Sequence, residues 1–269
     1  MKLLKKIYLA TIFLFLYAPI IVLIFFSFNR SRTRGHWDGF SLHWYRELFA
    51  DPKILNALYN TLSVAFISSA IAVLIGTAAA ICIFNLRSFI RNIILHVTRI
   101  PLANPDIVTG LSLMILFVFV FRFFHFGTFG YWTLLLSHIV FNVPYVIFSV
   151  LPRIKYLNNN IFEAALDLGA TPFFALRKII LPELMPGVIT GFMLAFTLSI
   201  DDFVVSFFTT GSGVNNLSVL IYSMARRGIN PKINALSSLM FIAVLILLYV
   251  VNKRDVVLSK FENNPGDVQ

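Results

Sequence analysis

The sequence predicts an all-α integral membrane protein, a bundle of six transmembrane helices. Its 269 residues are 58% hydrophobic and only 13% charged, whereas soluble globular proteins average roughly 45–50% apolar and about 25% charged residues. The apolar residues gather in runs of about 20 or more, the length that crosses a bilayer core. Lys and Arg lie in the short segments between these runs, so the formal net charge of +10 reports membrane topology rather than a nucleic-acid-binding patch.

Six apolar runs are expected to span the membrane, which puts both termini on one side. They are residues 7–28, 58–84, 93–123, 130–151, 185–208 and 234–252. The first run follows three lysines but is too long for a signal-peptide core and has no small-residue cleavage site, so we expect it to remain as a span. We predict a single transmembrane domain over residues 1–252 and a polar cytoplasmic tail over residues 253–269.

The third run is longer than a bilayer requires. Its roughly 31 residues would extend about 46 Å as a helix at ~1.5 Å per residue, more than the ~30 Å hydrocarbon core. Pro101 and Pro105 lie near its middle. Proline removes a helical hydrogen bond and clashes with the preceding turn, so a bend or break is predicted there.

Little in the apolar runs points to metal or redox chemistry. Cys82 is the only cysteine and lies within an apolar run, so neither a disulfide framework nor a cysteine metal site is expected. His138 and Asn142 lie one helical turn apart in the fourth run, and we expect them to bond within the bundle rather than to hold a metal. Gly187 and Gly191 form a Gly-x-x-x-Gly pattern that permits close helix packing.

One polar segment, Glu163–Pro182, interrupts the apolar chain and predicts a short pair of helices. Asn160 is a candidate cap for the first helix, and Gly169 suits the left-handed position that ends it. Thr171 is expected to cap the second helix, with Pro172 at its first position. Pro182 is expected to end that helix.

The same segment resembles the EAA loop of ABC importer permeases of the binding-protein-dependent type. The matching positions, in order and spacing, are Glu163, Ala164, Ala165, Gly169, Ile179, Leu181 and Pro182. The resemblance implies a type I importer permease with a MetI-like core. It also implies that a cytoplasmic loop, residues 153–183, forms the coupling helix that sits in a cleft of an ATPase.

The chain has no Gly directly followed by Lys and therefore no P-loop of the Walker type. We expect no enzymatic activity and no cofactor in this chain. ATP and Mg would be bound by a separate ATPase.

Other stretches resemble the spermidine/putrescine permeases, PotC type, within that family. They are residues 17–20, 27–29, 44–45, 104–108, 198–206 and 221–224. The resemblance implies ATP-driven polyamine import across the bacterial plasma (inner) membrane, with both termini cytoplasmic. The implied partners are membrane lipid, a second homologous permease forming a heterodimer, two cytoplasmic ABC ATPase subunits and an extracytoplasmic polyamine-binding protein.

Three carboxylates within the apolar runs are the candidate substrate path. Asp106 lies at the predicted break, and Asp201 and Asp202 are adjacent in the fifth run. Each costs roughly 2.5–3.5 kcal/mol at the centre of a spanning helix, so such groups usually face a cavity. No Lys or Arg balances them at that depth, and the ammonium groups of a polyamine would. Alternatively, Ser199, Thr197 or backbone groups at a kink hold one of them, or it is protonated.

Ser199 is assigned to the path together with Trp44 and Tyr45, whose rings can stack on an alkyl-ammonium. Anchoring at the membrane interface is the alternative role of the two aromatic residues. The outer loop, residues 29–57, carries more basic than acidic side chains and would not attract a cation. We expect this loop to dock a protein that carries the substrate.

Two other functions remain open from the sequence. The first is an ABC importer permease for another solute, such as ferric iron, thiamine or a phosphonate. The second is a cation carrier or channel driven by the membrane potential, which would transport without an ATPase. A purely structural membrane scaffold would leave the carboxylates in the apolar runs unexplained.

Overall fold

The computed structural model describes residues 2–31, 36–125, 127–157, 159–227 and 231–246. These residues are almost entirely helical, which confirms the predicted all-α class. Five helices are long and apolar enough to cross a membrane: Leu4–Ser27, Pro52–Phe84, Asp106–Phe124, Tyr131–Tyr156 and Pro172–Asp201. The chain forms two compact units, one of Met1–Leu55 with Leu220–Gln269 and the other of Asn56–Val219. The single transmembrane domain expected over residues 1–252 stays a prediction.

The first unit contains α1 (Lys2–Ser27), α2 (His43–Phe49) and a further helix, Pro231–Ile246. Large apolar side chains along α1 are exposed, as expected of a helix whose solvent is lipid. The sixth predicted span coincides with Pro231–Ile246 as far as the chain is described. Residues 247–269, which include the predicted polar tail, lie outside the described residues.

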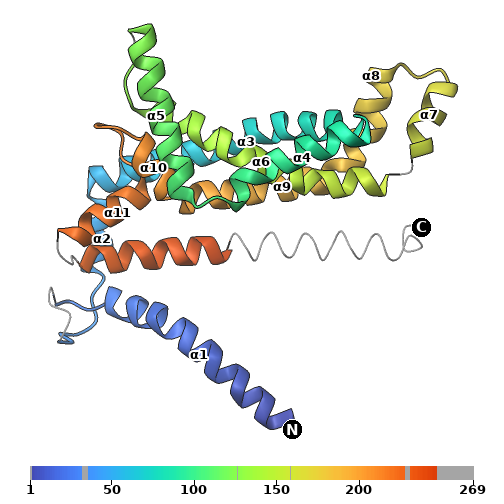
Figure 1. The fold of residues 1–269 in the computed structure, drawn as a ribbon. Coiled ribbons are helices and arrows are strands. Elements are labelled where there is room, and N and C mark those ends of the chain that lie inside the picture. Colours follow the sequence, from blue (N-terminus) through green and yellow to red (C-terminus); the bar gives the residue numbers. More distant parts are fainter. Residues whose placement is uncertain (1, 32–35, 126, 158, 228–230, 247–269) are drawn as a thin grey trace. The chain divides into compact units, whose positions relative to one another are not determined.

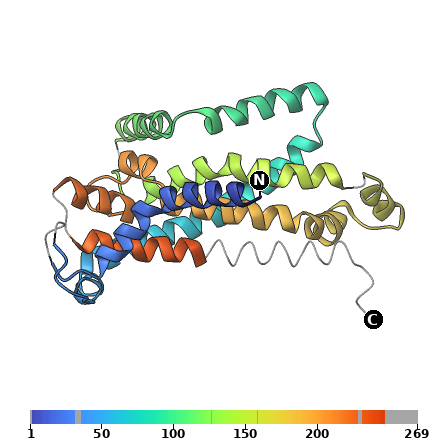
Figure 2. The ribbon, with the colours of Figure 1, turned by 90° about the horizontal axis from the view of Figure 1, so that it is seen from below.

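The second unit is a helical bundle around α6 (Tyr131–Tyr156). Figure 1 shows α6 beside α3 (Pro52–Phe84) and α9 (Leu181–Asp201), with α4 (Ser88–Ala103) along the same bundle. Its main core is apolar and is formed by Ala72, Ala80, Ile83, Leu95, Val146, Ile147, Val150, Leu151, Ile154, Leu184 and Ala195. Figures 1 and 2 place α7 (Asn159–Asp167) and α8 (Pro172–Ala175) at one end of this bundle and α10 (Val204–Thr209) at the other.

Two of the predicted spans are broken. The third consists of α4 and α5 (Asp106–Phe124), separated by the extended residues Asn104 and Pro105; this confirms the predicted break. Pro101 lies inside α4 without ending it. The fifth was expected to run to residue 208, and this is wrong. Helix α9 ends at Asp201 because Asp202 adopts an extended ψ of 123°, and α10 begins two residues later.

Close contact between α6 and its neighbours depends on glycine. A Cβ at Gly76 of α3 would lie 2.8 Å from Val146 Cβ, and one at Gly187 of α9 would lie 3.1 Å from the Ser149 carbonyl oxygen. The Ser149 hydroxyl donates a 2.8 Å hydrogen bond to the Gly187 carbonyl. Small residues let helices approach closely in a membrane, where lipid supplies no hydrophobic force between them.

Gly187→Ala is therefore expected to destabilise the α6–α9 contact. Its methyl group meets Ser149 backbone oxygen and the Arg153 side chain at 2.9–3.1 Å, and overpacking of this kind costs about 1–3 kcal/mol. Gly191→Ala is the matched control, because its Cβ would have ordinary contacts at 3.4 Å. Thermal unfolding of the purified chain in detergent measures the difference, and equal unfolding midpoints would contradict the packing argument.

Candidate functional site

The polar segment, Glu163–Pro182, folds as two short helices joined by a tight turn. Helix α7 ends in a left-handed Gly169 with φ of 88°. The Ala170 and Gly169 N–H groups donate to the Ala165 and Leu166 carbonyls at 3.0 and 2.9 Å. This is the Schellman arrangement, for which glycine is favoured because it has no Cβ. The predicted role of Gly169 in the turn is confirmed.

The second helix begins as predicted but does not end as predicted. Thr171 accepts a hydrogen bond from Phe174 N at 3.3 Å, and Pro172 follows in the first turn of α8. Pro182 was expected to stop this helix, and that is wrong. The chain passes through a wide π-turn, η1 (Leu176–Ile180), where Leu181 N bonds to Leu176 O, and continues as α9. Proline fits helical φ, and the preceding turn already departs from α-helical bonding.

Helix α7 also begins earlier than predicted. It already includes Asn160, so the predicted capping position is wrong by at least one residue. Glu163 is the fifth residue of the helix and is exposed.

The turn brings three of the predicted coupling residues to one hollow. Ala165, Gly169 and Ile179 line a depression of about 510 Å³ together with Leu168, Ala170, Thr171 and Phe174. Leu168 is 89% exposed and Phe174 53% exposed. Large apolar side chains open to water beside a hollow are typical of a protein-binding surface.

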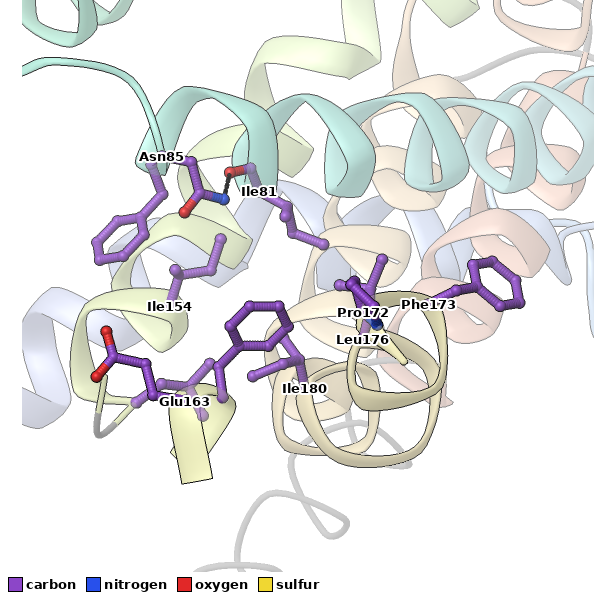
Figure 3. A pocket seen from close by; sticks show the side chains of 11 residues that line it. Ile81, Asn85, Ile154, Glu163, Pro172, Phe173, Leu176 and Ile180 are labelled. Atoms are coloured by element: carbon purple, nitrogen blue, oxygen red, sulfur yellow. Dashed lines mark hydrogen bonds between the residues drawn. The ribbon is translucent and has the colours of Figure 1, made fainter. Parts of the chain in front are cut away.

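The remaining coupling residues lie elsewhere. Ala164 is exposed on α7, and Leu181 and Pro182 are exposed in the first turn of α9. Glu163 lines a second pocket of about 760 Å³, where the segment faces the ends of α3 and α6 (Figure 3). Glu163 and Asn85 lie on one side of this pocket and Phe173 on the opposite side, with apolar side chains between them.

The three candidate carboxylates lie at the opposite end of the bundle, at the two helix breaks. Asp106 is the first residue of α5, and Asp201 is the last residue of α9; both are exposed. The breaks are adjacent because α5 packs on α10: a Cβ at Gly110 would lie 3.3 Å from Val204 O. Neither carboxylate forms an ion pair within the described part of the chain. Asp201 is about 30 Å along α9 from Leu181 at ~1.5 Å per residue.

Asp202 is held very differently from its neighbour. Its Oδ1 accepts from Val205 N at 3.1 Å and its Oδ2 from Ser206 N at 2.7 Å. His138 Nε2 lies 3.6 Å from Oδ2, and the Asp202 side chain is only 6% exposed. Asp202 thus caps α10, which corresponds to the alternative in which backbone groups at a kink hold one of the carboxylates.

Ser199 belongs to a buried polar cluster that we define as Ser68, His138, Asn142, Ser199, Asp202 and Ser206. Asn142 Nδ2 donates to Ser199 Oγ at 2.7 Å, and Ser68 Oγ lies 3.3 Å from Ser199 Oγ. His138 Nε2 lies 3.0 Å from Ser206 Oγ. The expectation that His138 and Asn142 bond within the bundle is confirmed, and the cluster joins α3, α6, α9 and α10.

Trp44 and Tyr45 are tied into the first unit. The Trp44 indole N–H donates to Asn29 O at 2.7 Å, and the side chain is 3% exposed. Tyr45 OH lies 2.7 Å from Ser27 Oγ, and its ring packs on Phe28. In this arrangement the Trp44 ring presents no free face to a cation.

Sequence reasoning missed the extension of the polar cluster toward α11 (Leu217–Arg226). Asn216 Nδ2 donates to Ser206 Oγ at 2.7 Å, and Thr61 Oγ1 donates to Asn216 Oδ1 at 3.1 Å. Thr61 and Ser68 lie two helical turns apart within an apolar run. That spacing on one helix face was the available signal, but it does not identify the partner helices.

Comparison with known proteins extends these observations. Residues 72–253 match the family described as "Binding-protein-dependent transport system inner membrane component". The chain is 39% identical over 269 residues to "Spermidine/putrescine transport system permease protein PotC" of Escherichia coli (strain K12), covering 100% of this chain and 99% of that protein. It is also 39% identical over 240 residues to "Putrescine transport system permease protein PotI" of the same organism, covering 88% and 85%.

Solved structures share the fold. A chain of a bacterial ABC transporter involved in the import of the acidic polysaccharide alginate superposes with a TM-score of 0.71 at 18% identity, covering 96% of this chain and 95% of that chain. A chain of the MetNI methionine ABC transporter gives a TM-score of 0.60 at 19% identity, covering 75% and 94%. At such identities the likeness concerns the fold alone.

Proposed function

Because the chain belongs to the family of binding-protein-dependent transport system inner membrane components, we propose that it is the membrane-spanning permease of an ATP-driven importer for polyamines, spermidine or putrescine. It is a multi-pass membrane protein and a transport subunit rather than an enzyme. The observation that carries the cargo class is the likeness along the whole chain to permeases named for spermidine and putrescine.

The exposed carboxylates supply chemistry that suits a polyamine. Asp106 and Asp201 stand at adjacent breaks and form no ion pair with a basic residue in the described ranges, so ammonium groups separated by methylene chains could neutralise them in turn. Asp202 and Ser199 are bonded inside the bundle and act as supports in this conformation. We therefore assign the contact with the polyamine to Asp106 and Asp201 in preference to Trp44 and Tyr45.

The proposed mechanism is alternating access driven by a separate ATPase. The surface that receives its movement is the polar segment, with the hollow lined by Ala165, Gly169 and Ile179. Helix α9 leads from that segment to Asp201 without a break in the helical path, so displacement at one end reaches the carboxylate at the other. One such chain provides half of a pathway, and a second permease, two ATPases and a binding protein complete the importer. Both termini would be cytoplasmic.

Reconstitution tests the proposal. Proteoliposomes that contain the chain, its permease and ATPase partners and a loaded binding protein are expected to take up labelled spermidine or putrescine only with ATP. Excess unlabelled polyamine should compete, whereas thiamine, ferric iron and a phosphonate should not. Uptake by this chain alone, driven by membrane potential, would instead support the channel or carrier alternative. Competition by one of the other solutes would reassign the cargo.

A further inference from the structure

The connection that follows α1 and the first turns of α2 together form a cationic hollow of about 620 Å³. It is lined by Arg30, Phe40, Ser41, Leu42, His43, Trp44 and Arg46. All of these residues belong to the first unit, and neither the polar segment nor the carboxylates at the helix breaks contribute to it. A molecule bound in this hollow would therefore be different from the one bound at the polar segment or at the carboxylates.

The loop that forms the hollow is held by hydrogen bonds around Asn29. Asn29 Nδ2 donates to His36 O at 2.7 Å, and Asn29 Oδ1 accepts from Asp38 N at 2.9 Å. Asn29 and Phe40 form an antiparallel bridge, and Arg30 N bonds to Gly39 O at 3.1 Å. These bonds hold Arg30 beside the strand-like residues that precede α2. The hollow is thus shaped before any partner binds, which lowers the entropy cost of binding.

Charge within this unit is segregated. Lys232 Nζ lies 2.9 Å from Glu47 Oε2 and 3.8 Å from Asp51 Oδ2, and His43 Nε2 lies 3.0 Å from Glu47 Oε1. The carboxylates of Glu47 and Asp51 are therefore engaged. Among the described residues, no carboxylate forms an ion pair with Arg30 or Arg46, and both arginines are exposed. The hollow therefore contains two guanidinium groups that form no ion pair with the described residues.

These features favour an acidic protein surface as the binding partner of the hollow. Guanidinium groups bind carboxylates in paired, directional hydrogen bonds, and the walls offer Phe40, 71% exposed, and Leu42, 48% exposed. Arginine together with exposed aromatic surface is typical of protein interfaces. A polyamine, being a cation, would be repelled from this hollow.

We infer that the hollow lined by Arg30 and Arg46 receives a carboxylate side chain of the extracytoplasmic binding protein and holds that protein on the permease. The inference rests on the proposed function, since it takes the binding protein as partner. It adds the residues and the chemistry of the contact. Charged contacts of this type mainly raise the association rate and fall with ionic strength.

Charge reversal in the complete importer tests this contact. Arg30→Glu and Arg46→Glu are expected to raise, by about tenfold, the concentration of loaded binding protein that half-maximally stimulates ATP hydrolysis in nanodiscs. Basal hydrolysis and subunit assembly should remain unchanged, and the wild-type value should rise with salt. Lys53→Glu is the matched control, since it makes the same charge change at an exposed residue in the first turn of α3 that belongs to the same unit and does not line the hollow; it should shift the value less than twofold.

A charge swap identifies the partner group. A Glu→Lys or Asp→Lys change on the binding protein should restore stimulation of the Arg46→Glu importer and weaken stimulation of the wild type. Shifts in Arg30→Glu and Arg46→Glu no larger than in Lys53→Glu would overturn the inference. So would shifts that vanish in nanodiscs made only of zwitterionic lipid, because the hollow would then bind an anionic headgroup.

The assay needs a loaded binding protein that stimulates the importer, whatever its cargo. If a binding protein loaded with another solute stimulates ATP hydrolysis and the polyamine-loaded protein does not, the polyamine assignment is rejected. The comparison of Arg30→Glu and Arg46→Glu with Lys53→Glu still tests the contact in that case.

Discussion

Asp202→Ala is expected to destabilise the chain by roughly 2–4 kcal/mol, the sum of a lost helix cap and a buried donor left without an acceptor. The Asp202 carboxylate accepts from two backbone N–H groups at 2.7 and 3.1 Å and lies beside buried His138. Lipid and protein interior offer no water to replace it. Thermal unfolding in detergent and the yield of assembled importer measure the loss.

Asp201→Ala is the matched control on the neighbouring residue. Asp201 is exposed, and its side chain accepts no hydrogen bond from the described residues, so the unfolding midpoint should remain near that of the wild type, within the roughly ±0.5 kcal/mol usual for surface changes. Polyamine uptake should fall, with KM rising about tenfold for each 1.4 kcal/mol of lost binding. Asp202→Asn should be intermediate in stability, because one amide oxygen still accepts. Equal destabilisation by the two alanine variants would contradict the division of roles.

Gly169→Val is expected to uncouple ATP hydrolysis from transport. Gly169 has φ of 88°, and a left-handed conformation costs a residue with a Cβ roughly 1–2 kcal/mol. Apart from the chain neighbours of Gly169, no described atom lies within 4 Å of a Cβ placed there, so the Cβ itself meets open space. The valine side chain strains the turn and projects from a residue that lines the hollow, where we propose that the ATPase docks. Uptake should drop about tenfold or more, as a loss of 1.4 kcal/mol implies, while hydrolysis continues.

Gly169→Asn separates backbone strain from side-chain volume. Asparagine tolerates the left-handed position better than other residues with a side chain, so this variant should retain more transport than Gly169→Val if the turn geometry dominates. Equal loss in both variants would assign the effect to volume in the hollow. Full transport by Gly169→Val would count against docking at this turn. The two rates, uptake and ATP hydrolysis, are measured on the same reconstituted importer.

Local features of the sequence predicted much of the molecule. The length of the apolar runs predicted the long helices, and Pro101 and Pro105 predicted the break between α4 and α5. Gly169 and Thr171 took their predicted places because a left-handed turn and a helix cap depend on a few neighbouring residues. The position of Pro182 was misjudged because a π-turn upstream accommodates it, and such a turn has no reliable local signature.

By itself, then, the sequence determined the class of protein, the helices and the polar segment with its resemblance to importer permeases. The protein class and the helices follow from composition, periodicity and short-range backbone preferences, whereas the resemblance rests on motif residues at matching spacings. Only the tertiary structure distinguished Asp201 from Asp202, which are chemically identical neighbours. In the structure Asp201 is exposed at the end of α9, whereas Asp202 is hydrogen-bonded to α10 beside His138. The two hydrogen bonds from Val205 N and Ser206 N to Asp202 are local, but the burial of Asp202 beside His138 joins residues 64 positions apart, which no local pattern encodes.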